Sequence, residues 1–466
     1  MDRKWQQYGP LDDSTPSVLV FYTAATCNLK CSYCYIDKNP VLGKIDKKLE
    51  ESFNDPDYYF DFAKEIIAKE NLTEIQFWGG EPTLGLLRIL PTLEKIINYY
   101  PKLNSFMFST NFTIANWFET FDVFLKFLSQ FPNKYYTIDV QLSLDGPKNI
   151  NDLGRGSGTT EKFGQNFNRL IEKLKDMDNW IPDNVRLKCH FKPTLSIETI
   201  PLLQTEKDVF NYFKFFDQLM ESVVIYNNEH FEFFPTIPNV ATPSNHTKND
   251  GILFANFCKI CNFLTKKNET EKIFKVYTSI IPFLPRPDDN LKELGYANGC
   301  GTCGLATSMV GLLPEHKISL CHMGFVDLMQ EYKEAAIKNK DDFHSIDTNL
   351  FSNKTEGFKT TCTVEEYLKQ RSQLLNFYNS ESTFQMVNLV GEIMFLANCG
   401  MIDSKYQDQK EAILAARFIQ TLPYCMRDCV NVTGSIILYP MGTLKLLLNG
   451  AKEYIDAGED FLRRIE

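Results

Sequence analysis

Six short apolar segments alternate with longer amphipathic segments through the first half of the chain, and this alternation restricts the fold more than any other feature. The apolar segments predict strands at residues 17–24, 73–80, 105–111, 136–146, 184–194 and 230–239. The segments between them carry apolar residues at helical spacing. Strict β–α alternation predicts a parallel α/β sheet with right-handed crossovers. Six units are too few for a closed eight-unit barrel, so an open partial barrel and a doubly wound sheet both fit.

The pattern changes near residue 240, where the polar stretch "PNVATPSNHTKNDG" predicts a linker or loop. A helical stretch follows at 252–280, and a cysteine-bearing segment begins near 296. We expect an N-terminal segment, an α/β domain, a linker with a helical bridge, and a smaller, mostly helical C-terminal domain. These span residues 1–16, 17–245, 246–295 and 296–466, respectively.

Charge and composition exclude several classes of partner. The chain has 466 residues and a formal charge of −10, and it contains no run of five Lys or Arg, so a nucleic-acid partner is disfavoured. The N-terminus lacks the apolar core of a signal peptide, and the longest apolar stretches are broken by Pro and Gly. We expect a cytoplasmic protein without membrane contact. Its thirteen cysteines should stay reduced and, where clustered, bind metal.

Three cysteines lie within eight residues in "TAATCNLKCSYCYIDK", immediately after the first predicted strand. They are Cys27, Cys31 and Cys34. Thiolate clusters bind zinc or iron–sulfur centres, and a structural zinc site requires four ligands. This loop has no histidine, and the next cysteine is Cys189. Three thiolates suit a 4Fe–4S cluster whose fourth iron stays open for an exchangeable ligand.

The segment "CNLKCSYC" resembles the C-x3-C-x2-C signature of radical S-adenosylmethionine (SAM) enzymes, with Tyr33 at the usual aromatic position. The resemblance implies a partial (β/α)6 barrel of TIM-like form and a 4Fe–4S cluster whose open iron is chelated by SAM. One electron, from a flavodoxin- or ferredoxin-like donor, then cleaves SAM to methionine and a 5′-deoxyadenosyl radical. That radical takes a hydrogen atom from the substrate.

The second predicted strand ends in "FWGGEPTL", which resembles the glycine–glycine–glutamate motif of the same family. Gly79 and Gly80 allow a ligand to approach the backbone closely. The resemblance implies that Glu81 helps to hold the SAM amino group. Taken alone, the same residues are typical of a turn.

The third and fourth predicted strands end in polar residues that also resemble family positions. Ser109 and Asn111, in "FSTN", resemble residues that meet the ribose and methionine portions of SAM. Ser143 and Arg155 resemble a serine and an arginine that grip its carboxylate, for which a guanidinium is suited. Asp145 is interpreted as an organiser of the turn. A polar turn at 108–111 and a flexible surface loop at 155–158 are the alternative interpretations.

The C-terminal cysteines resemble the SPASM or twitch extension of radical SAM enzymes, in which cysteines flanking a short β-hairpin bind an auxiliary cluster. Glu315 and His316 replace the usual Asp-Gly turn of that hairpin. The resemblance implies one auxiliary iron–sulfur cluster, expected to be 4Fe–4S, and a structural zinc site is the rival. Its predicted ligands are Cys300, Cys303, Cys321 and Cys429, with Cys425 in reserve.

Radical SAM proteins with such extensions mostly modify peptides or proteins, which implies a maturase that forms a crosslink or oxidises a side chain. His322 follows Cys321 directly. Sulfatase-maturing members of the family carry at this place an aspartate that acts as a general base, so His322 is the candidate proton acceptor. About 16 residues precede the first strand, so we expect no leader-peptide-binding domain. The alternatives are a radical SAM enzyme for a small molecule and a non-catalytic iron–sulfur or zinc protein.

Overall fold

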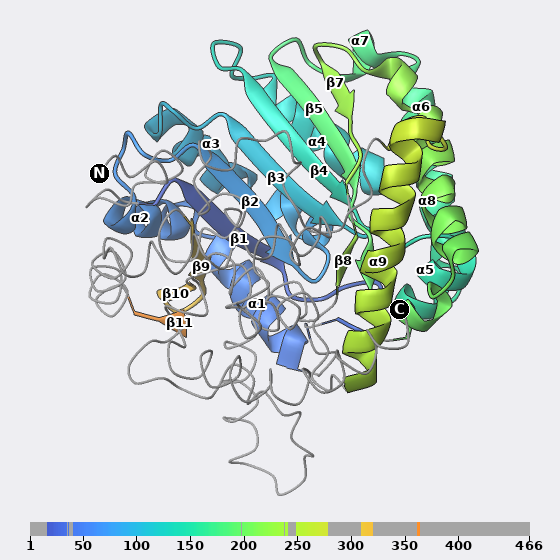
Figure 1. Cartoon of the computed structure of the whole chain (residues 1–466). Coiled ribbons are helices and arrows are strands. Elements are labelled where there is room, and N and C mark those ends of the chain that lie inside the picture. The colour runs from blue at the N-terminus through green and yellow to red at the C-terminus, as the bar shows by residue number, and fades with distance from the viewer. Residues whose placement is uncertain are drawn as a thin grey trace, which may run out of the picture.

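Among the described residues, a nine-stranded sheet organises the fold, with strand order β11-β10-β9-β1-β2-β3-β4-β5-β7 (Figure 1). The computed structural model describes residues 16–34, 36, 41–196, 198–236, 238–240, 248–277, 309–319 and 361–363. The strands are β1 (Val18–Ala24), β2 (Glu74–Gly79), β3 (Ser105–Thr110), β4 (Tyr136–Leu142), β5 (Val185–Phe191), β7 (Phe231–Phe233), β9 (Met309–Leu313), β10 (Lys317–Ser319) and β11 (Thr361–Cys362). Two further strands, β6 (Thr194–Leu195) and β8 (Asn239–Val240), form a small parallel pair.

Helices cover one face of this sheet, which explains the buried alternate positions of the strands. The helices are α1 (Val41–Phe53), α2 (Pro56–Ile66), α3 (Leu90–Tyr99), α4 (Trp117–Leu128), α5 (Lys148–Arg155), α6 (Thr159–Leu174), α7 (Met177–Trp180), α8 (Glu206–Glu221) and α9 (Lys248–Glu271). Short 3-10 helices are η2 (Pro82–Leu84), η3 (Leu86–Ile89), η4 (Ile200–Leu202) and η5 (Val224–Tyr226). Phe124 of α4 packs on Phe106 of β3, with 5.5 Å between ring centroids, and Phe216 of α8 packs on Phe191 of β5 at 5.4 Å.

The six predicted strands pair in parallel and in chain order, from β1 through β5 to β7. A doubly wound sheet would reverse its order at a switch point, so this order excludes that alternative. The α/β class with a singly wound, open, TIM-like partial barrel is confirmed. The carboxyl ends of these strands form one edge, where the predicted site residues follow β1 to β4.

The predicted hairpin exists as β9 and β10, but it joins the main sheet. β9 pairs in parallel with β1, with Val18 opposite Met309 and Phe21 opposite Leu312. Its turn rests on the first helices, because the His316 ring stacks on Phe62 of α2 with 4.0 Å between centroids. Residues 309–319 therefore extend the α/β sheet, although the sequence places them in a separate C-terminal domain. The rest of that predicted domain, apart from β11 and the residue after it, lies outside the described residues.

Replacing His316 by alanine is expected to lower the free energy of unfolding by about 1–2 kcal/mol, because the stack on Phe62 is lost and alanine tolerates a positive φ poorly. His316 has φ 57°. Chemical denaturation of the full chain measures the effect. Glu65→Gln is the control, since it removes only an exposed charge 3.2 Å from His316 Nε2 and should change stability by less than about 0.5 kcal/mol. Equal effects of the two substitutions would contradict the stacking argument.

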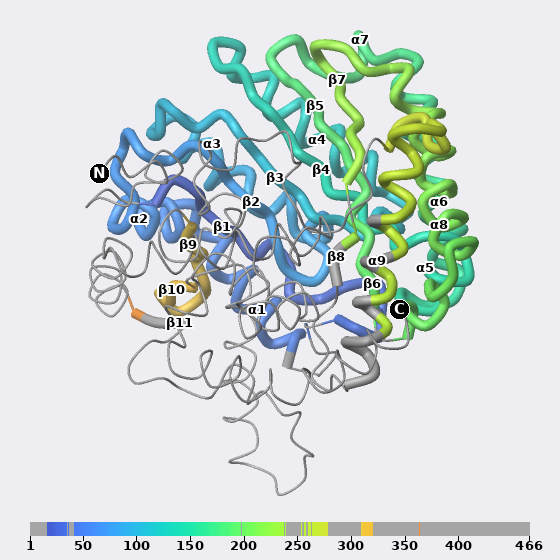
Figure 2. The backbone as a smooth tube through the Cα atoms, in the orientation of Figure 1, coloured from blue at the N-terminus to red at the C-terminus, as the bar shows by residue number. Residues whose placement is uncertain are grey.

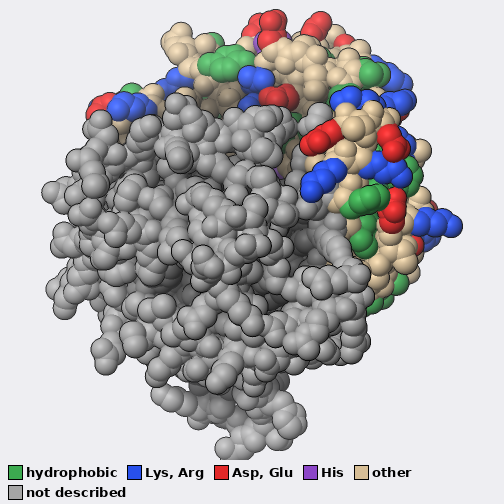
Figure 3. All heavy atoms as spheres, viewed as in Figure 1, with side chains coloured by type: hydrophobic (Ala, Val, Ile, Leu, Met, Phe, Trp, Pro, Cys, Tyr) green, Lys and Arg blue, Asp and Glu red, His purple; other side chains and the backbone are tan. Residues whose placement is uncertain are grey.

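Helix α9 runs beside α8 at the far edge of the described structure (Figure 2). Phe257 of α9 packs on Phe213 of α8 with parallel rings. On the surface of these helices basic and acidic side chains are interspersed (Figure 3), as in the ion pair of Lys267 with Glu206. Among the described residues, no helix combines the length and the apolar character that crossing a membrane requires.

Candidate functional site

The three-cysteine loop leaves the carboxyl end of β1 and is tied to the first helix. Asp46 of α1 accepts hydrogen bonds from the backbone N–H groups of Ala25 and Thr26, at 2.6 and 3.1 Å. Cys27 and Cys34 are exposed and Cys31 is half-buried, and none of the three forms a disulfide bond. Within the described part of the chain, no three Cys, His, Asp or Glu side chains converge closely enough to enclose a metal ion. The cluster ligands therefore stay a prediction, although three reduced thiols on one loop are the donors that an iron–sulfur cluster takes.

The surroundings of Cys27 oppose ionisation of its thiol. Loss of solvation by the surrounding protein, and then the Glu81 carboxylate, raise the pKa of Cys27 to about 12, while the Leu29 N–H that reaches its sulfur acts in the opposite direction. Without a metal this thiol is protonated at neutral pH. A bound cation has to displace the proton, because only the thiolate is a good ligand.

The two glycines at the end of β2 bring the backbone against the cysteine loop. A Cβ atom on Gly79 would lie 2.0 Å from the carbonyl oxygen of Ala24, and one on Gly80 would lie 2.2 Å from that of Thr26. The Gly80 N–H donates to Ala24 O at 2.8 Å, and the Glu81 N–H donates to Thr26 O at 3.0 Å. Their lack of side chains is needed for this backbone contact. Approach of a ligand to the same glycines stays a prediction.

Glu81 is fully buried, and its carboxylate already has four hydrogen bonds. Oε1 accepts from the Thr83 N–H, the Thr83 hydroxyl and the Thr110 hydroxyl, and Oε2 accepts from the Asn111 N–H at 2.7 Å. Burial raises the pKa of Glu81, and these donors offset part of that shift. Since a carboxylate has about four acceptor positions, Glu81 joins the ends of β2 and β3 and has little capacity left for an ammonium group.

Asn111 connects the end of β3 to the cysteine loop. Its Nδ2 donates to Asn28 Oδ1 at 2.7 Å and lies 3.5 Å from the sulfur of Cys27. Its Oδ1 accepts from the backbone and hydroxyl of Thr113. Asn28 was not singled out in the sequence, where its only signal is its place next to Cys27. The structure thus brings Cys27, Glu81 and Asn111 together at one strand edge.

The two predicted serine contacts lie on neighbouring strands. Ser109 is half-buried near the end of β3, and Ser143 is half-buried directly after β4. The Ser143 N–H donates to Thr110 O at 2.8 Å, which aligns the two strand ends. Both side chains are at the carboxyl edge, as predicted, and their contacts to a cofactor stay a prediction.

Arg155, at the end of α5, forms a buried ion pair. Its Nη2 donates to Asp145 Oδ1 at 2.7 Å, and the Tyr33 hydroxyl donates to Asp145 Oδ2 at 2.5 Å. Although burial alone would lower it, the Asp145 carboxylate raises the pKa of Arg155 further above its usual range. The Nε atom of Arg155 is buried without a hydrogen-bond partner. This is an orphaned donor near the cysteine loop, and an anionic group would satisfy it.

The face of the sheet opposite the described helices carries polar side chains that sequence reasoning left unassigned. Lys188 lies 3.4 Å from Glu232 of β7, and the His190 Nδ1 lies 3.1 Å from Asp139 Oδ1 of β4. His190 is 4% exposed, and the pair departs from regular hydrogen-bond geometry. The sequence signal for this polar face was the spacing of Lys188 and His190, because alternate residues of a strand share one face.

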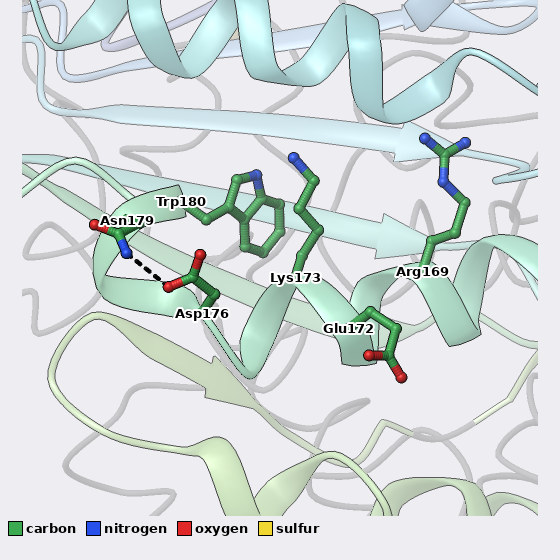
Figure 4. A pocket seen from close by; sticks show the side chains of 6 residues that line it. All are labelled: Arg169, Glu172, Lys173, Asp176, Asn179 and Trp180. Carbon is green, nitrogen blue, oxygen red and sulfur yellow. Dashed lines mark hydrogen bonds between the residues drawn. The ribbon is translucent and has the colours of Figure 1, made fainter.

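A cavity of about 360 Å³ lies on the outer helices α6 and α7 (Figure 4). Its lining residues are Arg169, Glu172, Lys173, Asp176, Asn179 and Trp180. The basic side chains are already paired, Arg169 with Glu119 and Lys173 with Asp122 of α4. No predicted site residue lines it, so it does not contribute to the strand-edge site.

Several predicted residues lie outside the described structure. These are Cys300, Cys303, Cys321, Cys429 and the reserve Cys425, together with His322. The described hairpin β9–β10 separates Cys303 from Cys321 along the chain.

Replacing Glu81 by glutamine is expected to destabilise the chain by about 1–3 kcal/mol, because the amide NH2 would face donors that now meet a carboxylate oxygen. Urea denaturation of the metal-free chain measures this directly. Glu94→Gln, on the exposed face of α3, is the matched control and should lie within about 0.5 kcal/mol of the wild type. A loss no larger than that of the control would show that the four hydrogen bonds are not formed.

Comparisons with known proteins find similarity over part of the chain. Residues 21–181 match the model of the radical SAM superfamily. A cysteine-type anaerobic sulfatase-maturating enzyme of Clostridium perfringens is 31% identical over 150 residues, which cover 30% of this chain and 35% of that protein. The same enzyme of a second strain is 29% identical over 156 residues, again covering 30% and 35%. The chain thus matches about a third of the length of these curated relatives.

Solved structures of Streptococcus suis SuiB are also similar. SuiB bound to S-adenosylmethionine is 15% identical with a TM-score of 0.36, covering 74% of this chain and 69% of that one. SuiB bound to its precursor peptide SuiA is 15% identical with a TM-score of 0.37, covering 76% and 71%.

Proposed function

Because this chain carries a radical SAM domain at residues 21–181, we propose that it cleaves SAM reductively and uses the resulting radical to take a hydrogen atom from a peptide or protein. The product is a crosslink or an oxidised side chain. The observation that carries the proposal is the meeting of the three-cysteine loop with the Gly79–Glu81 turn at one strand edge. A bound 4Fe–4S cluster would supply the electron that divides SAM into methionine and the 5′-deoxyadenosyl radical.

The residues of the strand edge have separate roles in this proposal. Cys27, Cys31 and Cys34 hold the cluster. Gly79 and Gly80 let the loop and the turn pack closely, and their backbone carries the SAM amino-group contact. Since the Glu81 carboxylate is hydrogen-bonded within the protein, it positions this turn.

Four side chains complete the proposed SAM site. Ser109 and Asn111 meet the ribose and methionine portions from β3. Ser143 and Arg155 bind the carboxylate, for which the buried unpaired Nε of Arg155 supplies the donor. Tyr33 borders the same space from the cysteine loop.

An auxiliary 4Fe–4S cluster held by Cys300, Cys303, Cys321 and Cys429 belongs to the proposal. Support comes from the hairpin β9–β10, which anchors the segment between Cys303 and Cys321 to β1. Four thiolates leave no open iron, which suits electron transfer. His322, beside Cys321, is the proposed proton acceptor.

The substrate class rests on the curated relatives, which are named sulfatase-maturating enzymes. The polar face of the sheet opposite the described helices, with Lys188, His190 and Asp139, gives a substrate polar and charged side chains to contact. A flavodoxin- or ferredoxin-like protein is the proposed electron donor, and the cytoplasm is the proposed location.

The test uses the transfer of deuterium. Full-length protein, reconstituted anaerobically, is incubated with SAM, dithionite and extract of its own source cells grown in deuterated medium. The extract is divided by ultrafiltration into macromolecules with peptides and a small-molecule filtrate. Mass spectrometry of 5′-deoxyadenosine should show deuterium with the first fraction. Deuterium with the filtrate alone would favour a small-molecule substrate, and no 5′-deoxyadenosine in any sample would overturn the enzyme assignment.

A further inference from the structure

One buried carboxylate receives hydrogen bonds from three separate segments around the cysteine loop. Asp145, directly after the end of β4, is 0% exposed. Its Oδ2 accepts from the Tyr33 hydroxyl at 2.5 Å. Its Oδ1 accepts from Arg155 Nη2 at 2.7 Å and from the Thr194 N–H at 2.9 Å. The loop, α5 and the chain after β5 therefore meet at a single side chain.

The cysteine loop is pressed against α5 at the same place. The Ser32 N–H donates to Gly154 O at 2.8 Å. A Cβ atom on Gly154 would lie 3.0 Å from Tyr33 Cε1 and 3.3 Å from Asp145 Oδ2. Ser32 and Tyr33 are the two residues between Cys31 and Cys34, so the whole connection between these thiols is fixed to α5.

Arg155 is fixed from two sides. Asp145 holds its Nη2, and the Tyr33 ring lies under its guanidinium, 5.6 Å from Cζ to the ring centroid. These contacts leave the buried Nε without a partner. A guanidinium has five N–H donors in a rigid plane, so fixing one edge sets the direction of the others.

Stability alone gives a weak reason for such an arrangement. Taking an arginine and an aspartate out of water costs free energy that their attraction does not reliably return, and an apolar pair of similar volume is often as stable. A buried ion pair that also leaves an N–H donor without an acceptor is typical of a ligand-binding site.

We propose that Asp145 is a positioning residue that sets the cysteine loop and Arg155 in register with each other. Its two oxygens have different roles, because Oδ2 fixes Tyr33 between the second and third cysteine, whereas Oδ1 holds Arg155 so that its unpaired Nε faces the SAM carboxylate. This inference rests on the proposed function, because it takes SAM as the ligand of Arg155.

The test compares Tyr33→Phe, Asp145→Asn and the double variant in the full-length, anaerobically reconstituted protein. Equilibrium dialysis with radiolabelled SAM gives the Kd, and the EPR spectrum of the dithionite-reduced cluster is recorded with and without SAM. We expect wild-type iron content in all three, because the thiols are unchanged. The Kd should rise about threefold in Tyr33→Phe and about tenfold in Asp145→Asn, with a weaker SAM-induced change of the EPR spectrum.

The double variant, Tyr33→Phe with Asp145→Asn, decides whether the two residues act through one hydrogen bond. Both substitutions remove the same hydrogen bond, so its Kd should equal that of Asp145→Asn. A loss equal to the product of the two single losses would overturn the coupling, as would wild-type SAM affinity in both single variants. If Asp145→Asn does not fold by circular dichroism, Tyr33→Phe decides alone through its Kd.

Asp217→Asn is the matched control. Asp217 of α8 is also 0% exposed, pairs with Lys214 and accepts from backbone N–H groups at 275 and 276. We expect wild-type SAM affinity for it, and an equal loss there would reduce the Asp145 effect to general stability. Failure of the wild type to bind SAM would instead overturn the proposed function, and this inference with it.

Discussion

Replacing Cys27, Cys31 and Cys34 together by alanine is expected to remove about four irons per chain from the anaerobically reconstituted protein and to abolish SAM cleavage. The reason is the chemistry of the donor set, since no other described side chain lies on this loop with a soft ligand atom. Iron and acid-labile sulfide are measured per chain, and 5′-deoxyadenosine formation is measured with dithionite. This substitution should have the largest effect on activity of any in the chain.

The iron content of the wild-type protein tests the auxiliary cluster in the same experiment. About eight irons falling to about four would support a second 4Fe–4S cluster in the C-terminal segment, while about four falling to none would leave the strand-edge cluster alone. Cys189→Ala is the matched control, because this thiol is buried on β5 and should leave iron and cleavage unchanged. Iron that persists in the triple variant with full SAM cleavage would refute the assignment of these ligands.

Replacing Gly80 by alanine is expected to destabilise the fold by about 3 kcal/mol or more. The added Cβ would lie 2.2 Å from the Thr26 carbonyl oxygen and 2.6 Å from that of Ala25. Both obstacles are backbone atoms, so no side-chain rotation relieves the clash. Denaturant unfolding of the metal-free chain measures the change, and reconstitution with iron should fall as well, because the displaced backbone begins the cysteine loop.

Gly164→Ala supplies the comparison. A Cβ atom there meets nothing within 4 Å, and the residue lies inside α6. Alanine should stabilise the chain by about 0.5–1 kcal/mol through helix propensity and a less flexible unfolded state. A similar stability change at the two glycines would mean that the β2 turn does not pack on the loop.

The strands were predictable because each is a short apolar run between polar turns, and burial against helices requires that pattern. The residues at which the strands end were less predictable. The segment 184–194 was expected as one strand, but β5 ends at Phe191 and Thr194 starts the separate pair β6–β8, whose partner strand begins at Asn239. Strand ends depend on which neighbour supplies hydrogen bonds, and that neighbour is distant in the chain.

The location of the site was predictable from the sequence, but the hydrogen-bond partners of its residues were less so. Polar residues after β1 to β4 had to meet at one edge, because parallel strands align their carboxyl ends. The uses of Glu81 and Asp145 were not predictable. Glu81 resembles a cofactor contact in the sequence, yet the fold surrounds it with the donors of Thr83, Thr110 and Asn111.

By itself, the sequence determined that this protein has a parallel α/β core of alternating strands and helices, with a three-cysteine loop after its first strand. Periodicity and spacing are local properties that the chain carries before it folds. The tertiary structure alone decided that β9 would pair with β1 across nearly 300 residues of sequence, and that Asp145 would join Tyr33 to Arg155. Those contacts depend on which surfaces burial brings together, and burial is a property of the whole chain.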